Sequence, residues 1–429
     1  MKIININDTS FGDEFETILT RAKSDIKNVT KIVTDLIDDI VENKNEALKQ
    51  HIAKFDKWEP KSDEDLCIST ESMKIAYDNL DSNLRQSLHL AFDRIKAFHE
   101  KQLPKSWIDF EKNGTILGQK ITPVDKAGLY IPGGKAAYPS SLLMNAIPAI
   151  VAGVEEIIVC TPTPNNEPNE LLLAACHLCG VSKVFKVGGA SAIAAMAYGT
   201  QNIPKVDVIT GPGNIFVATA KKLVFGEVNI DMIAGPSEIG ILADTTANPK
   251  YLAIDLLSQA EHDEMASSIL ITTDEALAQK VSFEVDEYLK VLSRTEIASK
   301  SINERGAIIV TNDIFEAIKL MNEIAPEHLE VVTQNPFELL PQIKHAGAIF
   351  LGENTPEPIG DYIAGPNHTL PTGGTAKFYS PLNVEHFMKK SSIISFSKQA
   401  IQEIGEQCAI LANTEGLTAH EESVRIRLK

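Results

Sequence analysis

The chain has 429 residues, of which 44% are hydrophobic and 23% are charged, a balance typical of folded globular proteins rather than disordered ones. This length exceeds what one ordinary hydrophobic core fills, so we expect two or more domains. The net charge of -18 argues against nucleic acid or an anionic membrane surface as the main partner.

The first residues, MKIININDTS, show no basic region followed by an apolar one, so no signal peptide is expected. No apolar run reaches about 18 residues, the length that can span a membrane as a helix. The chain has 5 cysteines, an odd number scattered over its length, which fits a reducing compartment better than a disulfide framework. We therefore expect a cytoplasmic protein.

The N-terminal quarter is predicted to be mostly helical. Apolar residues recur at roughly helical spacing among charged ones over residues 13–58. A further long helix is predicted over Met73–Gln102, where Leu80, Leu84 and Leu88 begin an apolar stripe.

From about residue 115, short apolar runs alternate with helices rich in small residues, which predicts parallel sheets covered on both faces. The first series has strands at 156–160, 184–187 and 206–210 and helices at 141–152, 190–198 and 214–225. The second series has strands at 239–243, 269–272, 307–311 and 348–351 and helices at 249–262, 273–291 and 313–323. Two α/β lobes with an active site between them are therefore expected.

After about residue 353, proline and glycine crowd a segment that is too long for a simple connector. Residues 383–429 are then predicted to form a small helical tail. The expected division is an N-terminal arm at 1–25, a first lobe from 26–125 and 237–380, a second lobe at 126–236, and the tail at 381–429.

The segment APEHLE places a carboxylate, Glu327, beside an imidazole, His328, directly after Pro326. Imidazole has the side-chain pKa nearest neutrality, so the pair could handle protons at working pH. Pro326 should end the preceding helix and present both groups at a helix-to-strand junction. Alone, the dipeptide is typical of a solvated surface pair, so the rest of the chain must decide.

A metal site is the next candidate. Gln259 and His262 are three residues apart, so they share one face of the predicted helix and could bind the same divalent metal. Further ligands could come from Asp361, His368 or His420, because Asp and His are ordinary zinc ligands. The alternative is a polar helix end with a histidine near the C-terminal dipole.

Two glycine-rich segments could approach a cofactor closely. Residues 128–134, GLYIPGG, are predicted to form a tight loop that exposes its backbone. Residues 211–214, GPGN, follow a strand and open a helix, a place that suits a phosphate. Neither matches the G-x-G-x-x-G fingerprint of dinucleotide sites, and the alternative for GPGN is a turn with Asn214 as helix N-cap.

Two other motifs receive no catalytic role. Cys176 and Cys179 have C-x-x-C spacing but lie in an apolar helical run without a second pair, so we interpret them as core residues. Ser237 lacks the G-x-S-x-G context of a nucleophile and is interpreted as a substrate-binding or capping hydroxyl.

Taken together, these segments resemble the histidinol dehydrogenase family over nearly the whole chain. The matching blocks are GLYIPGG (128–134), VGGASAIAAMAYGT (187–200), GPGN (211–214), DMIAGPSEIGILAD (231–244), LLSQAEHD (256–263), APEHLE (325–330), GDYIAGPNHTLPTGGTA (360–376) and the segment ending in His420. Their order and joint presence are specific, whereas one block alone is not. The resemblance implies an α/β fold of two incomplete Rossmann-like lobes of the aldehyde-dehydrogenase kind, with a helical N-terminal segment and the helical tail.

The resemblance also implies the positions of the site residues. The implied ligands of one zinc ion per subunit are Gln259, His262, Asp361 and His420. The implied acid/base pair is Glu327 and His328, and the implied NAD contacts are Tyr130, Asn214 and Ser191, where many relatives carry a longer glutamine. The substrate contacts implied besides the metal ligands and His328 are Ser237, His368 and Glu415.

The implied reaction takes L-histidinol, water and two NAD through L-histidinaldehyde to L-histidine, the last two steps of histidine biosynthesis. In our interpretation His328 removes the alcohol proton, Glu327 activates water, and zinc holds the substrate nitrogens. A homodimer is implied in which Glu415 and His420 complete the partner's pocket. Two rival hypotheses stay open: a zinc hydrolase of a small amide that works without NAD, and a zinc-stabilised oligomeric binding protein.

Overall fold

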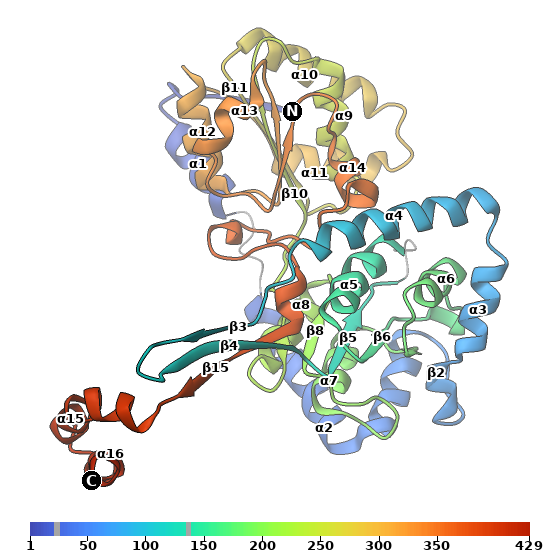
Figure 1. The fold of residues 1–429 in the computed structure, drawn as a ribbon. Helices are drawn as coiled ribbons and strands as arrows, with labels where there is room; N and C mark the ends of the chain where they lie inside the picture. The colour runs from blue at the N-terminus through green and yellow to red at the C-terminus, as the bar shows by residue number, and fades with distance from the viewer. Residues whose placement is uncertain (21–25, 134–138) are drawn as a thin grey trace. The chain divides into compact units, whose positions relative to one another are not determined.

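The computed structural model describes residues 1–20, 26–133 and 139–429 (Figure 1). The chain divides into a larger unit, Met1–Gln102 with Asp125–Phe387, and a smaller unit, Leu103–Val124 with Met388–Lys429. The predicted α/β class is confirmed, because the larger unit contains two sheets that are almost entirely parallel. No helix among the described residues is long and apolar enough to cross a membrane.

The first sheet of the larger unit is parallel throughout, in the order β1-β12-β11-β10-β13-β14. Its strands are β1 (Lys2–Asn5), β10 (Glu238–Ala243), β11 (Ser267–Thr272), β12 (Gly306–Val310), β13 (His328–Val332) and β14 (Ala348–Leu351). The central strands are buried along their whole length, as expected for a parallel sheet with helices on both faces. We call this sheet and its helices the first lobe.

Two hydrophobic clusters lie against this sheet, with different helices in each. One cluster contains α9 (Pro249–Ala260), α10 (Glu275–Tyr288) and α11 (Thr295–Arg305). The other contains α1 (Phe11–Thr20) and α12 (Ile314–Ile324). Figure 1 shows these helices around β10 and β11. Successive side chains of each strand point to opposite faces of the sheet, and the helices on each face bury the apolar ones.

The second sheet has the order β2-β7-β6-β5-β8-β9, and only β2 runs antiparallel to its neighbour. Its strands are β2 (Cys67–Ile68), β5 (Lys126–Tyr130), β6 (Glu156–Cys160), β7 (Lys183–Phe185), β8 (Val208–Thr210) and β9 (Asn229–Ile230). The helices of this second lobe are α2 (Ile26–Phe55), α3 (Thr70–Asp78), α4 (Ser82–Glu100), α5 (Pro139–Ala152), α6 (Glu170–Leu178), α7 (Gly189–Tyr198) and α8 (Ile215–Val224).

The N-terminal helices belong with the second lobe, whereas we expected residues 26–125 to join the first. Helix α2 packs against α7 and α8 and shares their hydrophobic core, and β2 joins the second sheet. The single helix predicted over Met73–Gln102 is instead two helices, α3 and α4. The predicted helix is interrupted because Asp81 acts as a helix N-cap. Its carboxylate accepts hydrogen bonds from the N–H groups of Asn83 and Leu84 and so begins α4.

The prediction of a loop at 128–134 was wrong in its first half. Gly128–Tyr130 lie in β5, a central strand, and Ile131–Gly133 follow it. A Cβ atom at Gly128 would lie 2.6 Å from the Met196 sulfur, so this glycine allows a helix to pack closely on the strand. Gly134, residues 21–25 of the expected arm and residues 135–138 lie outside the described residues.

The interpretation of the C-x-x-C motif is confirmed. Cys176 and Cys179 are buried in the second lobe, and both are free thiols. Burial raises the pKa of the Cys179 thiol to about 12, which makes it unreactive at neutral pH.

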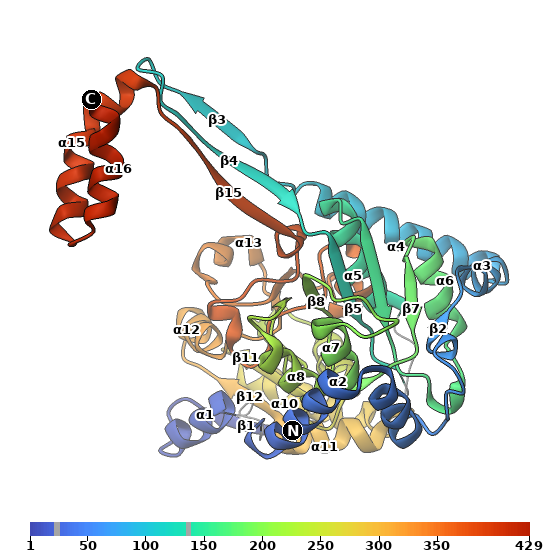
Figure 2. The same cartoon turned by 90° about the horizontal axis from the view of Figure 1, so that it is seen from below.

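The smaller unit combines an antiparallel ribbon with two helices (Figure 2). The strand order is β15-β4-β3, formed by Met388–Ser395, Ile116–Pro123 and Trp107–Phe110. Helices α15 (Lys398–Thr414) and α16 (Thr418–Leu428) pack against each other. The helical tail predicted from residue 383 was therefore wrong over β15, whose residues are largely exposed and lack the alternating pattern of a half-buried strand.

The first prediction concerns the packing of β10 beneath the turn at Pro326. A Cβ atom at Gly240 would lie 2.6 Å from the Met321 sulfur and 2.9 Å from Pro326 Cγ. We expect Gly240→Ala to lower the free energy of unfolding by about 1–3 kcal/mol, measured by urea denaturation. The control is Gly12→Ala, because no atom lies within 4 Å of its Cβ position. Equal stability of the two variants would contradict this packing.

Candidate functional site

The turn before β13 presents the carboxylate and imidazole that the sequence singled out. Helix α12 ends at Ile324, and Ala325 takes a left-handed conformation with φ 48° and ψ 63°. The predicted helix end at Pro326 is therefore confirmed, although Ala325 is left-handed rather than extended. His328 is the first residue of β13, as expected for a helix-to-strand junction.

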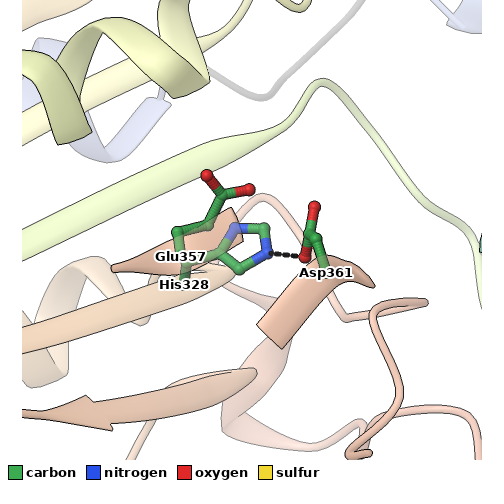
Figure 3. A group of neighbouring side chains, drawn as sticks. All are labelled: His328, Glu357 and Asp361. Atoms are coloured by element: carbon green, nitrogen blue, oxygen red, sulfur yellow. Dashed lines mark hydrogen bonds and ion pairs between the residues drawn. The ribbon is translucent and has the colours of Figure 1, made fainter. Parts of the chain in front are cut away.

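Both side chains are buried, with Glu327 7% and His328 3% exposed, which excludes the solvated surface pair. The Glu327 carboxylate Oε2 accepts a hydrogen bond of 2.9 Å from the Glu238 N–H. The His328 Nδ1 atom lies 3.1 Å from the Glu238 carbonyl oxygen, and Nε2 lies 3.3 Å from Asp361 Oδ1 (Figure 3). Because both ring nitrogens face acceptors, the arrangement favours a doubly protonated ring paired with an ionised Asp361.

The electrostatics of the three groups agree with this pairing. Burial lowers the pKa of His328, but the charges of Glu327 and Asp361 outweigh burial and raise it to about 10. Burial raises the pKa of Glu327 to about 8, against the opposing effect of the His328 charge. Burial also raises the pKa of Asp361, but its hydrogen bond to His328 and the His328 charge outweigh burial, so the pKa lies below its usual range.

Glu357 is a further buried carboxyl group that the sequence did not single out. It begins α14 (Glu357–Ile359), four residues before Asp361 in the next turn, η4 (Gly360–Ala364). Its Oε2 atom accepts a hydrogen bond of 3.0 Å from the Ser258 hydroxyl, and burial raises its pKa to about 8. The acidic pair at i and i+4 in EPIGD is the sequence signal that could have found it.

Glu357, His328 and Asp361 offer ligand atoms within 4.8 Å of one another, a possible metal group among the described residues (Figure 3). This group shares only Asp361 with the four zinc ligands that we expected. In this group the His328 imidazole is already paired with Asp361. The carboxyl groups of Glu357 and Asp361 would be the hard oxygen donors for a metal ion.

Gln259 is the predicted ligand with the most unusual surroundings. It lies on α9 and is 0% exposed, yet neither its Oε1 nor its Nε2 atom has a hydrogen-bond partner among the described residues. A buried amide without partners costs about 1–3 kcal/mol. An amide oxygen in this condition fits a metal ligand, because a bound cation would supply the missing partner.

His262 follows the end of α9 by two residues. Desolvation lowers the pKa of its ring, and the charges of Asp361 and His328 act on it in opposite directions. The structure therefore brings His262 into electrostatic range of Asp361, and with Gln259 these residues supply an imidazole, a carboxylate and an amide oxygen. This donor set suits a divalent metal such as zinc.

The remaining first-lobe residues lie around the same turns. His368 Nδ1 lies 2.9 Å from the Asp361 carbonyl oxygen, which ties it to the turn that carries Asp361. Ser237 is half-buried directly before β10, and its carbonyl oxygen accepts a hydrogen bond of 3.0 Å from Ser267 N–H. Glu415 and His420 belong to the smaller unit, where both are exposed.

The predicted cofactor residues lie at the ends of strands in the second lobe. Tyr130 ends β5, and its hydroxyl accepts a hydrogen bond of 3.1 Å from the Gly189 N–H at the start of α7. Asn214 is exposed and caps α8 by accepting from the N–H groups of Phe216 and Val217. The N-cap alternative for GPGN is thus observed, and it leaves the Asn214 Nδ2 group as the donor for a ligand.

Ser191 has a different environment from Tyr130 and Asn214. It is 3% exposed, and its hydroxyl lies 2.8 Å from His51 Nδ1. His51 Nε2 lies 3.0 Å from Asp39 Oδ2, so a chain of hydrogen bonds that is buried at Ser191 and His51 links α7 to α2. Sequence reasoning missed His51 and Asp39, because nothing in the spacing of α2 relates them to α7.

The fold by itself places the protein in a structural class. The fold is similar to that of an acetylating aldehyde dehydrogenase from Geobacillus thermoglucosidasius, with a TM-score of 0.50 at 13% identity, over 91% of this chain and 99% of that chain. At this identity the likeness concerns the fold alone. It confirms the predicted aldehyde-dehydrogenase-like architecture of two α/β lobes.

The chain matches the family profile described as Histidinol dehydrogenase over residues 19–428. It is 73% identical over 420 residues to the histidinol dehydrogenase of Sulfurimonas denitrificans, with 98% of each chain covered. The solved histidinol dehydrogenase from Elizabethkingia anophelis has a TM-score of 0.93 and 36% identity, over 100% of this chain and 98% of that chain. The chain therefore belongs to the histidinol dehydrogenase family, whose members are NAD-dependent oxidoreductases.

The second prediction follows from the unpaired amide of Gln259. Without metal, Gln259→Met should leave the free energy of unfolding unchanged or raise it by about 1–3 kcal/mol, since the variant buries no unpaired polar atom. Added Zn²⁺ should raise the melting temperature of the unsubstituted protein but not that of the variant. The control, Gln279→Met, changes an exposed glutamine of α10. Equal stabilisation of all three proteins by Zn²⁺ would exclude Gln259 as a ligand.

Proposed function

We propose that this protein oxidises L-histidinol to L-histidine in two successive NAD-linked steps, through L-histidinaldehyde, and so completes histidine biosynthesis. The observation that carries the proposal is the buried Glu327–His328 pair beside Asp361, in a chain of this family. Each step removes one hydride, and the second also adds water to the aldehyde. Two groups that exchange protons are therefore needed at one substrate carbon.

His328 is the proposed base for the alcohol proton. Its Nδ1 atom is engaged by the Glu238 carbonyl oxygen, so the ring is fixed with Nε2 toward Asp361. In the paired state Nε2 carries a proton, so the ring acts as the base only after Nε2 has released that proton. The fixed ring then holds Nε2 in one place for the alcohol proton, which lowers the cost of orientation during the reaction. His328 thus also contacts the substrate in this proposal.

Glu327 is the proposed base that activates water for attack on the aldehyde. Its carboxylate is held by the Glu238 N–H at 2.9 Å and lies 3.8 Å from His328 Nδ1. Burial raises its pKa to about 8, close to the working pH, and a general base is most effective when its pKa lies near that pH. The neighbouring residues thus take separate roles at one site.

The proposed zinc ligands are Gln259, His262, Asp361 and His420. The unpaired buried amide of Gln259 and the proximity of His262 to the Asp361 charge support the first three. Bound zinc would supply a template for the imidazole and amine nitrogens of the substrate. His420 enters the proposal from the family resemblance.

The other proposed contacts are shared between substrate and cofactor. Ser237, His368 and Glu415 are the proposed substrate contacts besides the metal ligands. Tyr130 and Asn214 are the proposed NAD contacts, which makes residues 126–236 the cofactor lobe; their positions at the carboxyl ends of β5 and β8 support this, because ligands of parallel α/β sheets bind there. Ser191 is retained as an NAD contact, although its burial leaves it little surface for a ligand.

A cytoplasmic homodimer is the proposed form of the enzyme, with Glu415 and His420 completing the partner's pocket. The smaller unit supports this by exposing large apolar side chains. These are Trp107 (53%), Phe110 (71%), Ile394 (69%), Leu411 (67%) and Ile426 (63%). Exposed apolar surface of this kind is usually covered by a partner, here a second copy of the chain.

The third prediction tests the function itself. The purified protein, supplied with L-histidinol, NAD and Zn²⁺, should produce two NADH for each histidinol consumed, measured by absorbance at the NADH band. A zinc hydrolase would act on a small amide without NAD, and a binding protein would give no NADH. One NADH per histidinol would contradict the second oxidation.

The fourth prediction concerns Glu327. Glu327→Gln should slow single-turnover oxidation of histidinaldehyde by about 10²- to 10⁴-fold, because the amide cannot accept a proton from water. The control is Glu353→Gln, which makes the same change at an exposed loop position. An unchanged single-turnover rate in the Glu327 variant would assign water activation to another group.

A further inference from the structure

The loop at 211–214 touches the end of β5 at the level of the backbone. Gly211 follows β8 and has a φ of +125°, a conformation that side-chain-bearing residues rarely adopt. A Cβ atom there would lie 2.0 Å from the Tyr130 carbonyl oxygen. No residue with a side chain fits at position 211. The loop contacts Tyr130 through the Gly211 backbone, and the distance between the loop and Tyr130 therefore depends on how the Gly211 peptide is held.

A buried ion pair holds both hydrogen-bonding groups of Gly211. The Gly211 N–H donates to Asp231 Oδ2 at 2.9 Å, and Lys221 Nζ donates to the Gly211 carbonyl oxygen at 2.9 Å. Lys221 and Asp231 also pair directly with each other, and their side chains are 3% and 0% exposed. Asp231 Oδ1 accepts a further hydrogen bond of 2.7 Å from the Met232 N–H.

The two charged residues of the pair come from different elements. Lys221 lies on α8, the helix that Asn214 caps, and Asp231 follows the edge strand β9. The loop is thus fixed at its first residue by the ion pair and at its last residue by the start of α8. Burying such a pair has a large desolvation cost, and well-packed apolar residues often give equal or greater stability. This cost points to a role in orientation rather than in stability alone.

We propose that Lys221 and Asp231 are positioning residues that clamp the Gly211 peptide and thereby set the separation of Tyr130 and Asn214 for NAD. The inference rests on the proposed function, in which those two residues contact the cofactor. Neither charged group needs to touch NAD, because both act through the backbone of one glycine. The clamp should therefore affect NAD binding and leave the histidinol site in the first lobe unchanged.

The fifth prediction uses Lys221→Met and the double variant Lys221→Met with Asp231→Asn. The double variant leaves no unpaired buried charge and keeps an acceptor oxygen for the Gly211 N–H, so it remains testable where the single variant does not fold. We expect the KM and the calorimetric Kd for NAD to rise about tenfold, because a tenfold weaker affinity corresponds to the loss of roughly one hydrogen bond. We expect kcat to change less than about twofold and the KM for histidinol to be unchanged.

The control is Lys126→Met, because Lys126 pairs with Glu156 at 3.0 Å at the amino-terminal ends of β5 and β6, away from the carboxyl end of β5 that Tyr130 forms. This variant should keep the affinity for NAD. An unchanged affinity in the double variant, with only a lower melting temperature, would overturn the clamp and leave a structural ion pair. NAD binding without histidinol oxidation by the unsubstituted protein would overturn the proposed function alone, and absence of NAD binding would overturn both.

Discussion

The arrangement of the site depends on the pairing of His328 with Asp361, whose side chains are 3% and 16% exposed. Charges taken out of water are stable only when they are paired and hydrogen-bonded, and this pair is completed by the Glu238 carbonyl oxygen on the other ring nitrogen. Burial raises the pKa values of Glu357 and of Glu330 on β13, whose carboxyl group accepts a hydrogen bond from the Glu357 N–H, whereas the pKa of Asp361 lies below its usual range. Asp361, which this pairing keeps ionised, is therefore also the carboxylate that we propose as a metal ligand.

The register of two strands explains how neighbours in sequence serve one site. Side chains that are adjacent on a strand normally point to opposite faces of the sheet. Glu327 escapes this rule because it precedes β13, whereas His328 begins it. The parallel register pairs His328 with Ile239, which places the Glu238 peptide beside both residues. Its N–H then holds Glu327 and its carbonyl oxygen holds His328, so a single residue of β10 orders the pair.

The sequence predicted those parts of the fold that a continuous or periodic run of apolar residues marks. The strands at 156–160 and 348–351 have the predicted bounds, because continuous apolar runs mark parallel strands. The sequence predicted neither β15, whose side chains are largely exposed, nor the central position of β5, which contains Gly128. In the site, the sequence predicted that Glu327 and His328 act together, because they are neighbours in the chain. It did not predict the contribution of Glu357, because that depends on a turn that folds back to β13.

Ser191 shows how a position can be used differently from what a motif implies. The Asp39 carboxylate can only accept, so His51 Nε2 carries hydrogen; desolvation lowers the pKa of His51, and the neutral ring then accepts the Ser191 hydroxyl hydrogen at Nδ1. The hydroxyl is left without a donor for a cofactor. Tyr130 at the end of β5 and the exposed Asn214 amide then remain as the stronger of the proposed NAD contacts, with the ordered loop at Gly211 between them. In the proposed cofactor site, the backbone position of this loop therefore matters more than the length of the side chain at 191.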